Sequence, residues 1–172
     1  MSRFQELSLV HQKELAEFEP IYFQTREELR SSDRAAWLRL HRLYPEFSDA
    51  WTQLDVRADV HVMTTRDQSS LRLLLDEFSI DIPSSRHWTK ERTDTKPDAV
   101  LTIARQSNIN PSTICYVDDH MDHLRDVSNT GAAVYWASWG YWPAALSPRD
   151  FRYATLSNLV DLPLLKEAVS CA

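Results

Sequence analysis

The 172 residues suffice for one domain with a substantial core, and 43% hydrophobic with 26% charged residues is typical of globular proteins. A net charge of −6 argues against nucleic acid or an anionic membrane as partner, because surfaces that bind them are usually basic. The apolar runs are too short to span a bilayer, the first residues do not resemble a signal peptide, and two cysteines do not make a disulfide framework. These features predict a cytoplasmic protein.

The two glycines of the chain, Gly131 and Gly140, exclude two common nucleotide sites. Neither the GxGxxG fingerprint nor the GxxxxGK[ST] loop can be written with them. Nucleotide binding by either of these phosphate loops is therefore ruled out.

Residues 1–54 are expected to be helical, since apolar side chains recur at three- and four-residue steps. Pro20 and Pro45 are expected to interrupt this segment, and Thr25 with Glu28 has the spacing of a capping box. We expect this helical segment to be separate from an α/β domain at 55–172.

From residue 55 onward the pattern alternates between short apolar strands and amphipathic helices, which predicts a parallel sheet covered by helices. Strands are expected at 59–64, 114–117, 132–136 and 151–155, and helices at 68–78, 97–106, 120–129 and 159–169. Gly131 is expected to close the helix at 120–129 in a left-handed conformation. Ligands of such sheets bind beyond the carboxyl ends of the strands, so polar residues there are candidates for a site.

Two of these candidates suit a phosphoryl group. Thr64 and Thr65 end the first strand, where a hydroxyl and nearby backbone N–H groups can hold a phosphate oxygen, although threonine is also common in strands for structural reasons. Lys96 stands directly before Pro97 at a helix start, where an ammonium can neutralise a phosphoryl group, although most such lysines are simply solvated.

The third candidate is the acid pair Asp118 and Asp119, which ends the apolar strand at 114–117. Two adjacent carboxylates are costly to bury, and Mg²⁺ is a suitable partner for them. The structural alternative is that Asp119 caps the helix that follows. His120 and His123, close to these acids, offer a further alternative as a transition-metal cluster, or they lie on the helix surface at the mouth of the site.

In the order hydroxyl, lysine, acid pair, these segments resemble the haloacid dehalogenase-like (HAD) phosphohydrolases, especially the phosphoglycolate-phosphatase-like members. The second motif of that family is matched by Thr64 in VMTTRD, and the third by Lys96 with Pro97. The fourth is matched by YVDDHMDHLRDVSNTGAAVYW, and the turn WGY after it is also similar to family usage. The resemblance covers about 56–169 and implies a Rossmann-type three-layer core, with 1–54 as a helical cap-like segment.

The same resemblance implies roles for these residues. Thr64, with Thr65, would orient the phosphoryl group of a small phosphorylated metabolite, Lys96 would neutralise its charge, and Asp119, assisted by Asp118, would hold Mg²⁺. The departure is that the family's first motif, Asp-x-Asp, is written nowhere in the chain. His120 and His123 also replace residue types that the family usually has there.

Three functions stay open at this point. The chain is a HAD-type phosphatase whose nucleophile strand is missing, because the sequence is incomplete or because another chain, including a second copy, supplies it. Alternatively it is a non-catalytic HAD-like binding or interaction protein, or, less favoured, a metal-dependent hydrolase that uses the His/Asp cluster directly. By the HAD mechanism the chain alone is expected to be inactive.

Overall fold

The computed structural model describes residues 11–44, 47–142 and 151–166. The chain divides into two compact units, one up to Arg42 and one from Leu43, so the helix that follows residue 46 belongs to the unit with the sheet. The sequence analysis placed that helix with the N-terminal segment. No helix within the described ranges is long and apolar enough to cross a membrane.

The first unit contains two helices, α2 (Gln12–Ser32) and α3 (Arg34–Arg39). The expected break at Pro20 is wrong, because this proline lies inside α2. The expected capping box at Thr25 is also wrong: its hydroxyl donates to the carbonyl oxygen of Ile21 within the helix at 2.8 Å. The observed cap is Asp33, whose carboxylate accepts the N–H of Ala36 at 2.8 Å and so starts α3.

The second unit contains five short parallel strands, which form two hydrogen-bonded sheets among the described residues. One sheet pairs β1 (Val62–Met63) with β2 (His87–Trp88), and the other has the order β3 (Cys115–Asp118), β4 (Ala133–Ala137) and β5 (Ala154–Leu156). β1 and β3 are thus both edge strands in this part of the chain.

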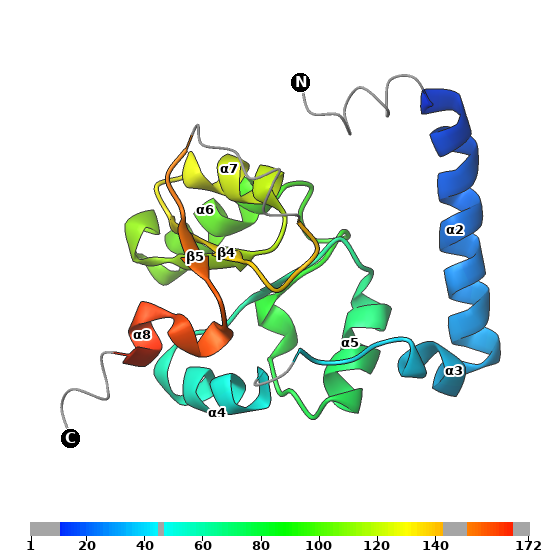
Figure 1. Cartoon of the computed structure of the whole chain (residues 1–172), viewed down its shortest axis with the longest axis horizontal. Helices are drawn as coiled ribbons and strands as arrows, with labels where there is room; N and C mark the ends of the chain where they lie inside the picture. Colours follow the sequence, from blue (N-terminus) through cyan, green and yellow to red (C-terminus); the bar gives the residue numbers. More distant parts are fainter. Residues whose placement is uncertain (1–10, 45–46, 143–150, 167–172) are drawn as a thin grey trace. The chain divides into compact units, whose positions relative to one another are not determined.

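Helices cover both faces of these strands, as the three-layer prediction requires (Figure 1). The helices of the unit are α4 (Phe47–Arg57), α5 (Gln68–Glu77), α6 (Lys96–Ser107), α7 (Met121–Ser128) and α8 (Pro163–Lys166), with 3-10 turns η1 (Ser84–Arg86), η2 (Pro111–Thr113) and η4 (Leu159–Asp161). α6 and α7 pack on one face and α4 and α8 on the other. Met63 of β1 and Ile114 before β3 both pack against the α6 cluster, so α6 bridges the two sheets.

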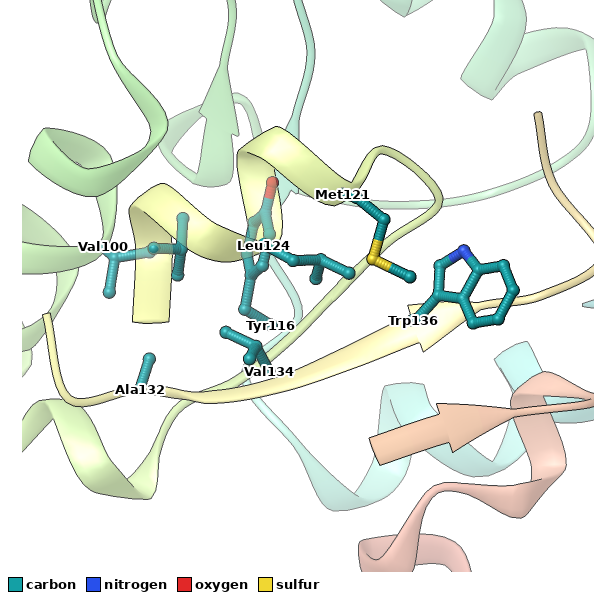
Figure 2. Close-up of a cluster of buried hydrophobic side chains, with 8 residues drawn as sticks. Val100, Tyr116, Met121, Leu124, Ala132, Val134 and Trp136 are labelled. Carbon is teal, nitrogen blue, oxygen red and sulfur yellow. The ribbon is translucent and has the colours of Figure 1, made fainter. Parts of the chain in front are cut away.

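One hydrophobic core cluster of the unit lies between α7 and the three-stranded sheet. Figure 2 shows Met121 and Leu124 pointing from α7 towards Val134 and Trp136 on β4. Met121 and Leu124 are fully buried, and each such side chain contributes roughly 1.5–3 kcal/mol through the removal of apolar surface from water. This packing fixes the start of α7 against the end of β3, which is where the acid pair lies.

Several predicted boundaries differ from the observed ones. The strand expected at 59–64 is limited to Val62–Met63, β2 was not expected, and the helix expected at 159–169 is a 3-10 turn followed by α8, with residues beyond 166 outside the described ranges. The prediction for Gly131 is confirmed in its sign: φ is +89°. The glycine lies two residues beyond Asn129, the C-cap of α7, and its N–H donates to Ser128.

Candidate functional site

The candidate residues are brought together by the way α6 connects β2 to β3. Lys96 is the first residue of α6, and Asp118 is the last residue of β3. The Nζ atom of Lys96 lies 2.6 Å from Oδ2 of Asp118, so the carboxyl ends of β2 and β3 are at the same edge. Thr64 follows β1, which runs parallel to β2, and its N–H donates to the carbonyl oxygen of Trp88 at 2.9 Å. Thr64 therefore lies at this edge too.

The start of α6 is determined by local sequence. Thr95 has extended backbone angles, and its hydroxyl oxygen accepts the N–H of Asp98 as an N-cap. Pro97 follows in the first turn, where the missing N–H costs nothing. The cap and the proline fix the first turn of α6, and with it the point from which the side chain of Lys96 extends.

Asp118 is the hub of the site. Its Oδ2 accepts hydrogen bonds from Lys96 Nζ and, at 2.5 Å, from the Tyr116 hydroxyl, while its Oδ1 accepts the N–H of His120 at 2.8 Å. The Nδ1 atom of His123 lies 3.2 Å from Asp118 Oδ2 and 3.0 Å from Lys96 Nζ. When Nδ1 carries a proton it donates to Asp118, and otherwise it accepts from Lys96. Only 9% of the Asp118 side chain and 18% of the Lys96 side chain is exposed.

The electrostatics of this hub favour an ionised Asp118 and a neutral Tyr116. Burial alone raises the pKa of the Asp118 carboxyl, but the hydrogen bond with His123 and the charge of Lys96 outweigh it and hold the pKa well below its ordinary value. Burial, and then the negative charge of Asp118, raise the pKa of the Tyr116 hydroxyl far above its ordinary value. Tyr116 is therefore a permanent donor to Asp118.

Asp119 has different partners. Its Oδ2 accepts the N–H of Tyr141 at 2.7 Å. Gly140 lies so close that a Cβ atom built there would be 2.2 Å from the Cβ of Asp119. The alternative in which Asp119 caps the next helix is wrong, because the N-cap of α7 is His120, whose side chain makes no capping hydrogen bond.

The two histidines form an aromatic group with Trp142 beside the hub. The ring centroids of His120 and His123 are 4.4 Å apart, and those of His120 and Trp142 are 4.8 Å apart in an edge-on arrangement. Burial, followed by the nearby His123, lowers the pKa of His120. Its Nδ1 is buried and makes no hydrogen bond to another described residue.

The acid pair and the histidines do not assemble a metal site by themselves. Within the described ranges, no group of three or more His, Cys, Asp or Glu side chains is arranged to hold a metal ion. Asp118 is engaged by Lys96, Tyr116 and the His120 N–H, and Oδ2 of Asp119 is engaged by Tyr141. The donor set therefore does not fit Mg²⁺ without further ligands.

The two threonines differ in their surroundings. Thr64 is half-buried, and its hydroxyl oxygen accepts the N–H of Arg66 at 3.1 Å, which leaves the hydroxyl proton to donate elsewhere. Thr65 is exposed. A cavity of about 330 Å³ lies to one side, and the residues that line it, Trp88, Arg92, Thr93, Asp94, Asp98, Thr102 and Gln106, include none of the predicted site residues.

The sequence analysis missed Tyr116 and the turn at Gly140 and Tyr141 as members of the site. Tyr116 could have been found, because residues two apart on a strand point to the same face, and Tyr116 precedes Asp118 by two. The contact of Asp119 with Gly140 could not have been found, since it depends on how the turn after β4 folds back over the edge.

The comparisons with known proteins concern the fold. No family model matches the sequence, and a search of curated proteins finds no match. Among solved structures, the chain is similar to a HAD-superfamily hydrolase, subfamily IA, variant 1, from Geobacter sulfurreducens PCA, with a TM-score of 0.57 and 20% identity. The likeness covers 72% of this chain and 61% of that one, so the chain spans less than two thirds of that protein. The fold is therefore HAD-like, with a Rossmann-type core and N-terminal helices.

Proposed function

We propose that this chain forms the phosphoryl-binding part of a HAD-type phosphatase for small phosphorylated metabolites. The observation that carries the proposal is the meeting of Lys96 and Asp118, from two different elements, at the carboxyl edge of the strands. Parallel α/β sheets bind their ligands at this edge. The HAD-like fold supports the same activity, because the similar solved structure is described as a hydrolase.

In this proposal each side chain binds or orients the phosphoryl group. Lys96 supplies the positive charge, and the Asp118, Tyr116 and His123 side chains around it hold its ammonium in place. Thr64 donates its hydroxyl proton to a phosphoryl oxygen, with Thr65 beside it. A charged donor held in advance in a largely buried site stabilises a phosphoryl group more than a mobile one in water does.

The carboxylate nucleophile is proposed to come from a further strand between β1 and β3. Both are edge strands in the described part of the chain. Met63 of β1 and Ile114 before β3 pack against the same cluster on α6, so the two strands lie on the same side of this helix. A parallel strand there would bring its carboxyl end to Lys96. The strand can be supplied by a further segment of this chain, by a second copy of it or by a different chain. Mg²⁺ binding through Asp119 requires the extra ligands that such a strand carries.

A second candidate function is favoured by two observations. The ammonium of Lys96 is already neutralised by a largely buried carboxylate, and the sequence has no Asp-x-Asp motif. Both features suit a non-catalytic protein that binds a phosphorylated ligand without turning it over. Both candidate functions bind the same class of ligand, and they differ in whether a further strand supplies a nucleophile.

The test is binding of inorganic phosphate, phosphoglycolate, a sugar phosphate and a nucleotide to the purified chain, measured by calorimetry with Mg²⁺ present. The variants are Lys96→Met and, as a matched control, Lys90→Met, which removes the same charge from an exposed residue. We expect at least one phosphorylated compound to bind, with about a tenfold or greater loss in Lys96→Met, since a charge-assisted hydrogen bond contributes about 1.5–3 kcal/mol.

Two results refute the proposal. In one, none of the phosphorylated compounds binds the wild-type chain. In the other, Lys90→Met weakens binding as much as Lys96→Met does, which would mean that only the net charge matters. If a chain that supplies the nucleophile strand is added and turnover then appears, the phosphatase is supported and the non-catalytic function is rejected.

A further inference from the structure

We infer that the turn Gly140–Tyr141 is the positioning device for Asp119, because its backbone approaches this carboxylate closely and donates a hydrogen bond to Oδ2. The inference rests on the proposed function for its ligand, but the contact itself can be tested without any ligand. The sequence singled out the turn WGY but did not predict its contact with Asp119, because Gly140 and Asp119 are distant along the chain.

The first observation is how closely the turn approaches the carboxylate. A Cβ atom at position 140 would lie 2.2 Å from Cβ, 2.6 Å from Oδ2 and 2.7 Å from Cγ of Asp119. Ordinary contacts of this kind are 3.4–4 Å long, so any other residue at 140 must push the two segments apart by about 1 Å. Glycine is required here for the close approach.

The second observation is what this approach achieves. It brings the N–H of Tyr141 to 2.7 Å from Oδ2 of Asp119, although Tyr141 itself is 80% exposed. The turn is anchored at both sides: Gly140 donates its N–H to the carbonyl of Ala137 at 3.1 Å, and the ring of Trp142 packs against His120. A backbone donor on an anchored turn fixes the carboxylate more firmly than a flexible side chain does.

The consequence is a carboxylate held in one orientation. The N–H of Tyr141 occupies one acceptor site of Oδ2, so the remaining acceptor sites of Asp119 face a ligand or a cation in a fixed direction. A shift of about 1 Å in such a group is enough to cost a site much of its effect. Gly140 and Tyr141 are therefore positioning residues for Asp119.

The contact is tested first by hydrogen exchange of the Tyr141 amide, in the wild-type chain and in Asp119→Ala, Gly140→Ala and Gly131→Ala. We expect slow exchange in the wild type, and an acceleration of about tenfold or more in the first two variants. Asp119→Ala removes the carboxylate acceptor, and Gly140→Ala pushes that acceptor away from the Tyr141 N–H. Gly131→Ala is the matched control: it strains a glycine with φ of +89° without introducing a clash. It should lower the unfolding temperature and leave the Tyr141 amide unchanged.

The role in binding is tested with phosphoglycolate and Mg²⁺, with Asp119→Asn as the reference. We expect Gly140→Ala to weaken binding as much as Asp119→Asn does, by about tenfold, while Gly131→Ala binds normally.

The inference is overturned if the Tyr141 amide exchanges freely in the wild type, or if Gly140→Ala changes neither exchange nor binding. It is also overturned if Asp119→Asn and Gly140→Ala both bind normally. A wild-type chain that binds no phosphorylated compound refutes the proposed function instead, and the exchange measurement then decides the inference alone.

Discussion

Replacing Lys96 by Met is expected to destabilise the fold by about 3 kcal/mol. The substitution keeps most of the aliphatic chain and removes the ammonium that lies 2.6 Å from Asp118, leaving a carboxylate whose side chain is only 9% exposed. Breaking a buried ion pair by removing one partner costs roughly 3–5 kcal/mol. Tyr116, His123 and the N–H of His120 still donate to Asp118, so we expect the lower end of this range.

The measurement is urea unfolding of the wild type, Lys96→Met, Asp118→Asn and the double variant, at neutral pH. Because each single variant strands the other partner, we expect the double variant to lose less stability than the sum of the singles, by about 1.5 kcal/mol or more. Lys90→Met controls for net charge and should change stability by less than about 0.5 kcal/mol. A loss below about 1 kcal/mol in Lys96→Met, or additive singles, would show that this pair behaves as a solvated surface pair.

Three further predictions concern a backbone angle, a histidine and a missing motif. Gly131→Val should cost about 1 kcal/mol or more in thermal or urea unfolding, because φ is +89° and a β-branched residue is strained there, while no atom lies within 4 Å of the added Cβ; an unchanged stability contradicts it. Burial, and then Arg86, lower the pKa of His61 below its ordinary 6.5, and its Nδ1 accepts the indole N–H of Trp88. The contribution of neutral His61 to the free energy of unfolding is therefore complete above pH 6.5 and is lost as the pH falls below that value. The decline in the free energy of unfolding between about pH 7.5 and about pH 5.5 should thus be smaller in His61→Gln than in the wild type. The purified 172-residue chain should not hydrolyse phosphate monoesters with Mg²⁺, since it has no Asp-x-Asp pair, and turnover that Asp119→Asn abolishes would contradict this.

The sequence was informative wherever the structure depends on local pattern. The start of α6 followed from Pro97, and the end of β3 followed from an apolar run that stops at Asp118. β2 was missed because it has only two residues, His87 and Trp88, and a strand of that length has no readable period. Pro20 was wrongly expected to interrupt the N-terminal helix, whereas α2 continues through it in the structure.

The site was harder to predict than the strands, because its contacts join residues from separate elements. Position alone placed Thr64 and the acid pair at the carboxyl edge of parallel strands, and the family resemblance added Lys96. The ion pair of Lys96 with Asp118 agrees with that placement. The partner of each side chain was not predictable in the same way. That Asp118 binds Lys96 and Tyr116, and that Asp119 binds the turn after β4, depends on packing in three dimensions.

The different partners of Asp118 and Asp119 follow from the geometry of a strand end. Successive side chains on a strand point to opposite faces, so two adjacent acids diverge unless the chain turns sharply between them. Asp118 shares a face with Tyr116 and meets Lys96, whereas Asp119 meets Gly140 and the N–H of Tyr141. The sequence analysis took the adjacency of the two acids as a sign of a shared cation. On a strand, however, adjacent side chains point to opposite faces, so their adjacency keeps the two carboxylates apart. A cation at this edge would contact the pair through Asp119, with its other ligands coming from elsewhere, and Asp118 would remain the counter-ion that holds Lys96 in place.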